Sequence, residues 1–522
     1  KPPFFNSLRF LVKKLRKEAH TFLSFMKTPI GKGDDRMEKY LMLDRRLLSP
    51  QGMANLKLEV SQPVKDEEHN PLFTEDRPWE VRIDNGYPNV LYDREAGCYR
   101  CYYTLFIEDE DSRLAGPEER ARRDYIPRPD RAPGLAYAES ADGIHWEKPS
   151  LGLADWHGSR ENNIIFPYAH GTGVMLDERE TDPSRRYKMV TKMDQPGTEA
   201  YMAVSFSPDG IHWETPIPWP EHNPPADSHN LPFWSEEEGC YMVLSRVWRD
   251  GIRVTTLSRS QDFIHWSEPK ETLRGTGFEN QIYAMPAFRW GNLYLGFASM
   301  IHEGDRTEPD FDQVDLELTW AADPGTFDFA APGQRLLPRG KGTYPDGEFD
   351  CCCLYASPLV TAPDGTLWLY YMGGNGRHTN FRETSLGRAK WQPDRFVALS
   401  PRRPEEESVL PTCSLIVSGG QLELLADPAD PAQPMEIRAA LAPAWNREAF
   451  PGFGYEDSTV TAGEGGSADG CGGGWLSIGF AGGLEKLAGQ KVSLILRMKN
   501  AKVWALRGDI ALGGHRLWEG AE

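Results

Sequence analysis

The chain has 522 residues, of which 39% are hydrophobic and 26% are charged, so it holds enough apolar material for a large core or for two domains. Its formal net charge of −19 argues against a binder of duplex nucleic acid, because such proteins neutralise phosphates with basic patches. A neutral polar substrate fits this charge better. No stretch approaches the roughly 20 apolar residues that span a bilayer, so we expect no transmembrane segment.

Residues 1–36 differ from the rest of the chain. The stretch "LRFLVKKLRKEAHTFLSFM" combines Lys and Arg with Leu and Phe at helical spacing, which predicts a short amphipathic helical extension. We expect this helix to pack on the body of the protein, with attachment to a membrane surface as the alternative. The stretch lacks the cleavage site and the long apolar core of a secretory signal, so we predict a cytoplasmic location.

One turn recurs three times along the chain. The sequence reads "SADGIHWE" at 140–147, "SPDGIHWE" at 207–214 and "SQDFIHWS" at 260–267, each time after several short strands. Two degenerate copies follow, in "LYLGFASM" with "LELTWAADPGTFDFA" and in "YASPLVTAPDGTLWLYYMGG" with "TSLGRAKW". Five units of about four short strands each are typical of propeller blades. The sequence therefore predicts an all-β protein with a five-bladed β-propeller over residues 37–404.

The repeated turn has a structural interpretation. A positive φ is easily adopted by Gly, and Asp can bond to nearby backbone N–H groups, so "DG" suits a tight reversal between strands. Because His145, His212 and His265 recur in every clear copy, we expect them to serve packing or surface roles rather than catalysis.

The eight cysteines lack the paired CxxC spacing of a zinc site. The run "CCC" at 351–353 cannot converge on one metal ion, because consecutive strand residues point to opposite faces. We expect reduced, mostly buried thiols and no metal bound by this run.

From about residue 405 the pattern changes to alternating strands, such as "LIVSGGQLELLADP" and "KVSLILRMKNAKVWALRG". This pattern predicts a separate C-terminal β-sandwich over residues 405–522. Residues 37–80 should form a strand-bearing segment that packs against the propeller.

The inner strands of a propeller begin at a central funnel, so residues at the heads of these strands converge although they lie far apart in sequence. The predicted heads are "IDNGYPN" with Asp84, "YAHGTG" with His170, "ADSHN" with Asp227 and His229, "FENQIY" with Glu279, and "DGEFD" with Asp346, Glu348 and Asp350. Four of these five heads carry carboxylates, which predicts an acidic pocket at the hub.

Two carboxyl groups that face each other are what glycoside hydrolysis requires, since one protonates the leaving oxygen and the other attacks the anomeric carbon or activates water. A separation of about 5 Å would give retention and about 6.5–9.5 Å inversion, and the sequence leaves this open. Nearby aromatic residues offer faces for sugar rings or belong to the core; they are Tyr87, Trp234, Tyr283, Trp290 and Tyr344.

These features resemble the glycoside hydrolases of families 32, 43, 62 and 68, the five-bladed furanosidase superfamily, and most of all family 32. The segments "RPWEVRIDNGYPNVLYD", "ADSHNLPFWSEEEGCYMVLSR" and "YEDSTV" carry the resemblance, which covers roughly residues 37–515. It implies a glycosidase or transglycosylase that acts on oligosaccharides or glycosides, namely fructofuranosides or arabinofuranosides.

The resemblance also implies roles for individual residues. Asp84 takes the place of the nucleophile, Asp227 that of the transition-state stabiliser, and Glu279 that of the acid/base. The flanking residues depart from the family motifs: Pro and Gly are exchanged after Asp84, no Arg and Pro flank Asp227, and no Cys follows Glu279. We expect the substrate to be contacted by His170, His229, Tyr283, Glu348 and Asp350, with the last two as further candidates for the acid.

Three alternatives stay open at this point. A glycoside phosphorylase would need a basic phosphate pocket, for which Arg246, Arg253 and His302 are candidates. A carbohydrate-binding propeller without catalysis and a protein-interaction scaffold are the other two. No cofactor is required by any of these activities. A structural Ca²⁺ would find oxygen ligands in the acidic run at 308–317, although a solvated lid is the simpler interpretation. The sequence leaves homo-oligomerisation open.

Overall fold

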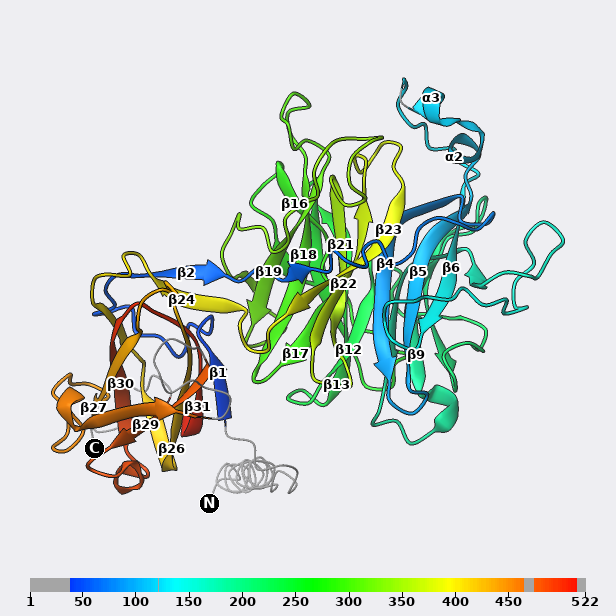
Figure 1. The fold of residues 1–522 in the computed structure, drawn as a ribbon. Helices are drawn as coiled ribbons and strands as arrows, with labels where there is room; N and C mark the ends of the chain where they lie inside the picture. Colours follow the sequence, from blue (N-terminus) through cyan, green and yellow to red (C-terminus); the bar gives the residue numbers. More distant parts are fainter. Residues whose placement is uncertain (1–37, 121, 464–473, 514–522) are drawn as a thin grey trace, which may run out of the picture.

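The computed structural model describes residues 38–120, 122–463 and 474–513. In these ranges the chain forms a five-bladed β-propeller and a C-terminal β-sandwich that lie side by side, as the sequence predicts (Figure 1). The predicted helical extension, residues 1–36, lies outside the described residues. Within the described ranges, no helix has both the length and the apolar composition needed to cross a membrane.

The first three blades are four-stranded antiparallel sheets. Blade 1 consists of β4 (Arg82–Asp93), β5 (Cys98–Glu108), β6 (Ala132–Ser140) and β7 (Ile164–Pro167). Blade 2 consists of β8 (Ala169–Leu176), β9 (Tyr187–Met193), β10 (Tyr201–Ser207) and β11 (Ile217–Pro218). Blade 3 consists of β12 (Leu231–Ser235), β13 (Cys240–Arg249), β14 (Ile252–Ser260) and β15 (Lys270–Arg274).

Blades 4 and 5 form one continuous sheet, because Val314 and Cys353 pair between them. Blade 4 consists of β16 (Asn280–Ala284), β17 (Ala287–Trp290), β18 (Leu293–His302), β19 (Val314–Ala321) and β20 (Asp328–Phe329). Blade 5 consists of β21 (Cys353–Thr361), β22 (Leu367–Gly374) and β23 (Thr384–Trp391). Its fourth strand is β3 (Val64–Lys65), so a segment that precedes the first blade completes the last one and closes the ring.

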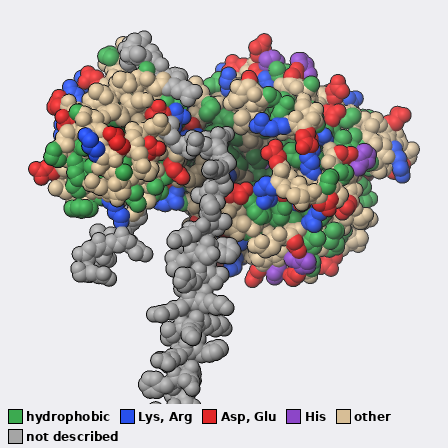
Figure 2. Space-filling model, turned by 90° about the horizontal axis from the view of Figure 1, so that it is seen from below, with side chains coloured by type: hydrophobic (Ala, Val, Ile, Leu, Met, Phe, Trp, Pro, Cys, Tyr) green, Lys and Arg blue, Asp and Glu red, His purple; other side chains and the backbone are tan. Residues whose placement is uncertain are grey.

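The repeated turn has the predicted structural role. In the first copy Ser140 Oγ accepts a hydrogen bond from Gly143 N at 2.9 Å, and Asp142 Oδ1 accepts from His145 N at 2.8 Å. The other two copies repeat these bonds, although Phe263 takes the place of the glycine with φ 70°. The side chains of the three turn histidines are 84%, 67% and 58% exposed. Figure 2 accordingly shows histidines (purple) at the periphery of the propeller.

A second repeated feature joins neighbouring blades. A tyrosine near the start of the strand that pairs with the innermost strand of one blade donates its hydroxyl to a carboxylate at or just after the end of the first strand of the preceding blade. The pairs are Tyr187 with Asp93, Tyr241 with Asp177 at 2.7 Å, and Tyr294 with Glu237 at 2.5 Å. All three tyrosines are buried. We call these three pairs the interblade clamps. Hydrogen bonds to charged groups are strong, so the clamps fix how the blades stack.

The C-terminal sandwich recruits strands from before residue 405. Its later strands are β25 (Ser408–Pro411), β26 (Leu415–Pro428), β27 (Glu436–Pro443), β28 (Ser458–Ala462), β29 (Gly474–Phe480), β30 (Lys491–Lys499) and β31 (Ala501–Leu512). The sheet also includes β1 (Glu38–Leu41), β2 (Leu56–Val60) and β24 (Val397–Pro401). The segment that we expected to pack against the propeller also pairs with the sandwich, because β1 bonds to β31 and β2 bonds to β24.

The few helices are short. Helices α2 (Glu110–Leu114) and α3 (Pro117–Arg120) follow β5 and protrude from the face where the inner strands begin (Figure 1). The 3-10 turns are η1 (Pro183–Arg185), η2 (Tyr455–Asp457) and η3 (Leu484–Leu487). We call the face that bears α2 and α3 the strand-head face, because the heads of the inner strands open onto it.

Replacing Tyr241 with Phe tests the interblade clamps. The change removes the hydroxyl that donates to Asp177 and keeps the ring, so the free energy of unfolding should fall by about 1–2 kcal/mol. The measurement is the urea midpoint of the full chain, with Tyr201→Phe at the exposed first residue of β10 as the control. Equal midpoints for Tyr241→Phe and the unmodified protein would show that the clamp adds no stability.

Candidate functional site

The head of β4 has an unusual backbone. Gly86 and Tyr87 both have positive φ, at 69° and 41°, and a Cβ on Gly86 would lie 2.3 Å from Met372 Cγ. A positive φ is rare for a bulky residue and is concentrated at functional sites. The resulting twist places the Tyr87 hydroxyl 2.8 Å from Asn85 Nδ2, from which it accepts a hydrogen bond. The motif "IDNGYPN" thus builds a strained strand head at the hub.

Asp84 lies in this strand head between two arginines. Its Oδ1 is 2.8 Å from Arg382 Nη2 and 3.2 Å from Arg82 Nε. The two arginine side chains are 0% and 3% exposed, and that of Asp84 is 16% exposed. Burial opposes ionisation, but the Arg382 and Arg82 guanidinium groups outweigh it and hold the pKa of Asp84 well below its usual range. The hub therefore contains a carboxylate that stays ionised at neutral pH.

Aromatic rings surround this carboxylate. Tyr283 and His378 pack edge to face with ring centroids 4.5 Å apart, and Tyr355 Oη lies 2.8 Å from His378 Nδ1. Burial, helped by the charge of Arg382, lowers the pKa of His378 well below its ordinary value, so the ring is neutral. Tyr283 also contacts Asn85, whose Nδ2 donates to its hydroxyl at 3.3 Å. The predicted substrate contact Tyr283 thus lies beside the Asp84 cluster.

Asp227 belongs to the same hub. The Tyr87 hydroxyl donates to its backbone oxygen at 3.5 Å, and Arg246 Nη2 lies 2.7 Å from its Oδ1. The guanidinium group of Arg246 lies 5.2 Å from the ring centroid of Tyr283. The Asp227 side chain is 41% exposed and that of Asp84 is 16% exposed. The structure therefore links the first two predicted catalytic residues through Asn85 and Tyr87.

Glu279 lies at the edge of the hub. Its side chain is exposed, and its backbone oxygen accepts from Glu303 N at 2.8 Å. The next two residues reach inward, since Asn280 Oδ1 lies 2.7 Å from His302 Nδ1 and Gln281 Oε1 accepts from Arg253 Nη1 at 3.1 Å. Glu279 is therefore adjacent to the hub in sequence and open to solvent.

The two predicted histidines pack against Tyr87. The His170 ring lies 6.0 Å from the Tyr87 ring and the His229 ring 5.9 Å, measured between centroids. His229 Nε2 donates to Asn89 Oδ1 at 2.9 Å, and burial lowers the pKa of His229 to about 3. His229 is thus a neutral, buried residue beneath the hub. The His170 side chain is 12% exposed and is the more accessible of the two.

The last predicted strand head serves another purpose. Asp350 is buried, and its Oδ2 lies 2.6 Å from Lys65 Nζ and accepts from the Tyr371 hydroxyl at 2.9 Å. Lys65 belongs to β3, so Asp350 holds the strand that closes the ring. Glu348 is exposed and accepts from Lys341 N at 2.8 Å. Asp350 therefore differs from the prediction of a substrate contact, because its carboxylate is already bound by protein groups.

A cavity of about 550 Å³ opens on the strand-head face. It is lined by Arg120, Arg122, Arg123, Asp124, Pro309, Gln313, Thr343, Tyr344, Cys352, Arg377, Asn380 and Phe381. Asn380 connects the cavity to the hub, because its backbone oxygen accepts from Arg82 Nη2 at 3.0 Å. The cavity thus begins next to a direct partner of Asp84, and Tyr344 is the predicted aromatic residue that lines it.

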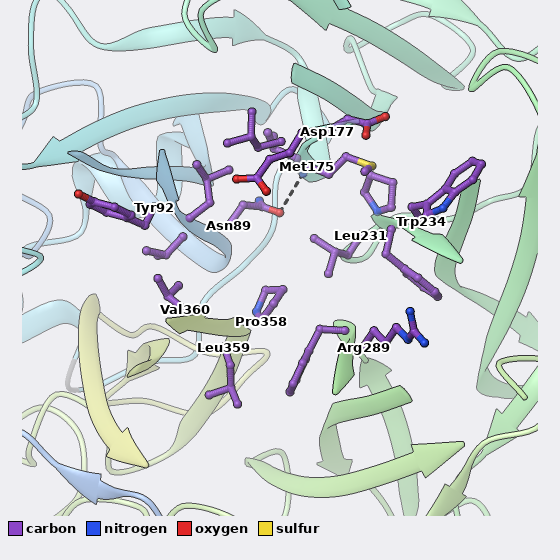
Figure 3. A pocket seen from close by; sticks show the side chains of 18 of the residues that line it. Asn89, Tyr92, Met175, Asp177, Leu231, Trp234, Arg289, Pro358, Leu359 and Val360 are labelled. Carbon is purple, nitrogen blue, oxygen red and sulfur yellow. Dashed lines mark hydrogen bonds between the residues drawn. The ribbon is translucent and has the colours of Figure 1, made fainter. Parts of the chain in front are cut away.

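Another cavity, of about 600 Å³, lies at the opposite end of the propeller axis and is shown in Figure 3. Leu231, Pro358, Leu359 and Val360 surround it. Asp177, which lines this cavity, accepts a hydrogen bond from the Tyr241 hydroxyl at 2.7 Å and forms an ion pair with Lys188 Nζ at 3.2 Å. Trp234, a predicted sugar-stacking residue, lines this cavity and not the hub. The lining mixes apolar and charged side chains, and it includes the exposed carboxylates of Glu178 and Glu236.

The acidic run at 308–317 has protein partners. Asp312 accepts from Thr379 Oγ1 at 2.6 Å, while Asp315 pairs with His302 at 2.7 Å and with Arg335 at 2.9 Å. In the described ranges, no three His, Cys, Asp or Glu side chains are grouped so that they could hold a metal ion. Five of the seven described cysteines are buried, including the three of the "CCC" run, and all seven are free thiols.

The predicted site residues did not include Arg82 and Arg382, the buried partners of Asp84, or the nearby Glu75. Glu75 Oε1 accepts from Ile83 N at 2.7 Å and from Thr384 N at 3.4 Å, so it joins the heads of β4 and β23. Burial, together with the carboxylate of Glu383, raises the pKa of Glu75 to about 8. Of these residues, only Arg82 carried a signal, because it lies two residues before Asp84 on the same side of a strand.

Comparison of the sequence with models of protein families and with curated proteins found no match. Among solved structures, the chain is similar to a glycosyl hydrolase from Bacteroides ovatus, at 17% identity and a TM-score of 0.42, over 66% of this chain and 98% of the other. An N-acetylgalactosamine deacetylase from F. plautii has 15% identity and a TM-score of 0.41, over 65% and 96%. A fructofuranosidase from Schwanniomyces occidentalis has 13% identity and a TM-score of 0.38, over 87% and 99%.

The raised pKa of Glu75 predicts a pH-dependent stability. The ordinary pKa of the Glu75 carboxyl group is 4.5. Between pH 4.5 and about 8, the unfolded chain has therefore released the Glu75 proton, whereas the folded chain retains it. The stability from Glu75 is therefore complete below pH 4.5 and is lost as the pH rises through 8. Glu75→Gln keeps the acceptor oxygen and removes this loss.

We expect the Tm of Glu75→Gln to equal that of the unmodified protein near pH 4.5 and to exceed it by a few degrees near pH 9. The control is Glu448→Gln, which changes an exposed glutamate and should give no pH-dependent difference. A constant Tm difference across this range would mean that Glu75 titrates normally in the folded state.

Proposed function

We propose that the protein is a glycoside hydrolase that acts on furanosides, with Asp84 as its reactive carboxylate. The observation that carries this proposal is the position of Asp84 at the hub, where it is partly buried and ionised, connected to Asp227 through Asn85 and Tyr87, and next to a cavity on the strand-head face. The furanoside class rests on the resemblance of the motifs around Asp84, Asp227 and Glu279 to those of the furanosidase superfamily.

The setting of Asp84 suits attack on an anomeric carbon. Its low pKa keeps the carboxylate ionised, so it can attack the sugar or activate a water without first losing a proton. A fixed negative charge in a water-poor hub also stabilises the positive charge of an oxocarbenium-like transition state. The exposed carboxylate of Asp227 can accept hydrogen bonds from sugar hydroxyls while Arg246 holds it in place.

The general acid requires a carboxyl group that can reach the leaving oxygen. We assign this role to Glu279, whose exposed side chain lies near two glycines: a Cβ on Gly277 or on Gly304 would be 3.2 Å from it. These glycines leave room for the Glu279 side chain to move. Glu75 is the rival candidate, because its pKa of about 8 keeps it protonated at neutral pH.

Asp84→Asn tests the role of the reactive carboxylate. The substitution should lower kcat on aryl furanosides by about 10²–10⁴-fold, because the amide neither attacks nor activates water. The control Asp364→Asn changes an exposed residue in the turn between β21 and β22 and should keep full activity. Folding is checked by circular dichroism, and Asp227→Asn provides a second variant at a more exposed carboxylate.

Turnover by well-folded Asp84→Asn at the unmodified rate would overturn the assignment. Calorimetric binding of sugars without release of any product by the unmodified protein would instead favour a carbohydrate-binding propeller.

Substrates with different leaving groups test the general acid. Glu279→Gln should lose at least about 10²-fold in kcat/KM on natural disaccharides and little on dinitrophenyl glycosides, whose leaving group departs without protonation. Glu75→Gln is measured on the same substrates. The same leaving-group dependence in Glu75→Gln, and its absence in Glu279→Gln, would transfer the role to Glu75.

A further inference from the structure

The hairpin of β13 and β14 presents two arginines and a tryptophan on one face. Arg253 lies directly opposite Trp248 in the antiparallel register, and Arg246 precedes Trp248 by two residues. The Arg253 guanidinium lies 4.4 Å from the Trp248 ring centroid and 5.4 Å from that of Tyr283. The Arg246 guanidinium lies 5.6 Å and 5.2 Å from the same two rings. Both cations are therefore held between aromatic faces beside Asp227.

Each guanidinium uses only part of its donors. The Arg246 side chain is 3% exposed and its Nη2 pairs with Asp227, while its Nε and Nη1 are buried without a hydrogen-bond partner among the residues that the structure describes. The Arg253 side chain is 12% exposed and its Nη1 binds Gln281 and Glu303, while its buried Nε has no partner in the same ranges. Buried donors without partners are costly and are rare in native proteins.

Four buried or nearly buried arginines meet at the hub. Arg82 and Arg382 pair with Asp84, Arg246 pairs with Asp227, and Arg253 pairs with Glu303. The chain as a whole carries a formal net charge of −19, so this cluster of arginines is a local feature of the hub. The remaining donors of Arg246 and Arg253 can bind a further acceptor there.

We propose that Arg246 and Arg253 form a subsite for an oxyanion, either a carboxylate or a phosphate group. The planar guanidinium fork matches the oxygens of both groups, and two adjacent forks can bind one of them from two sides. A neutral hydroxyl would accept from one of these donors, but hydrogen bonds to a charged acceptor are stronger. This subsite departs from the neutral substrate that the overall composition favours.

The oxyanion has two sources that share this chemistry. It is either the carboxylate of an acidic sugar that binds at the hub or free inorganic phosphate beside a neutral sugar. The inference rests on the proposed function only for the neighbouring sugar; binding of the oxyanion itself requires no turnover.

Calorimetry on the full chain distinguishes these sources. The ligands are inorganic phosphate, sodium galacturonate and galactose, at equal ionic strength set with chloride. We expect phosphate or galacturonate to bind at least about tenfold more tightly than galactose. Arg246→Met and Arg253→Met should each weaken that binding about tenfold or more, which corresponds to losing one charge-assisted hydrogen bond.

The matched control is Arg289→Met, at the opposite end of the propeller, where Arg289 pairs with Glu237 at 2.6 Å. It should leave oxyanion binding unchanged, and thermal unfolding reports whether each variant folds.

Preference for phosphate identifies free phosphate as the ligand, and preference for galacturonate identifies an acidic sugar. If neither anion binds better than galactose, or if binding survives both arginine substitutions, the subsite does not exist. Hydrolysis by Asp84→Asn at the unmodified rate, with intact anion binding, would overturn the proposed function and leave this inference standing, so the two proposals fail separately.

Discussion

The ion pair between the buried Arg382 and the partly buried Asp84 is the interaction on which the hub depends. It joins the first blade to the loop between β22 and β23 of the fifth blade, 298 residues apart in sequence. The Thr384 hydroxyl, at the head of β23, donates to the backbone oxygen of Asp84 at 3.1 Å and fixes the same junction. A buried charge without its partner costs several kcal/mol. Asp84 can therefore stay ionised at the hub only if the ring of blades is closed.

The interactions that close the ring of blades lie away from the hub. Strand β3 completes blade 5, and the buried pair of Lys65 with Asp350 holds that strand. The interblade clamps fix the spacing of the first four blades. The two ends of the axis then differ in how their charges are placed. The Arg382 side chain at the strand heads is 0% exposed, whereas Glu178 and Glu236 at the opposite cavity are exposed.

The sequence predicted the blades well because their information is local. The hydrogen bonds of each "DGIHW" turn lie within a stretch of six residues, so the same local sequence forms the same turn in every copy. The position of Asp84 followed from the order of strands in a blade. Arg382, β3 and β1 could not be predicted in the same way, since their partners lie hundreds of residues away and no pattern marks the pairing. Asp350 was predicted as a site residue because it lies at an acidic strand head. The sequence pattern of such a head is the same whether the carboxylate binds a substrate or a lysine such as Lys65.

The central claim is that sugars bind at the strand-head hub, against Asp84 and Asp227. A crystal structure of the protein soaked with a furanose monosaccharide tests this most directly. The account predicts electron density for the ring within hydrogen-bond distance of both carboxylates and in contact with Tyr283. Density only in the cavity at the opposite end of the axis, or only on the outer rim of the blades, would contradict it.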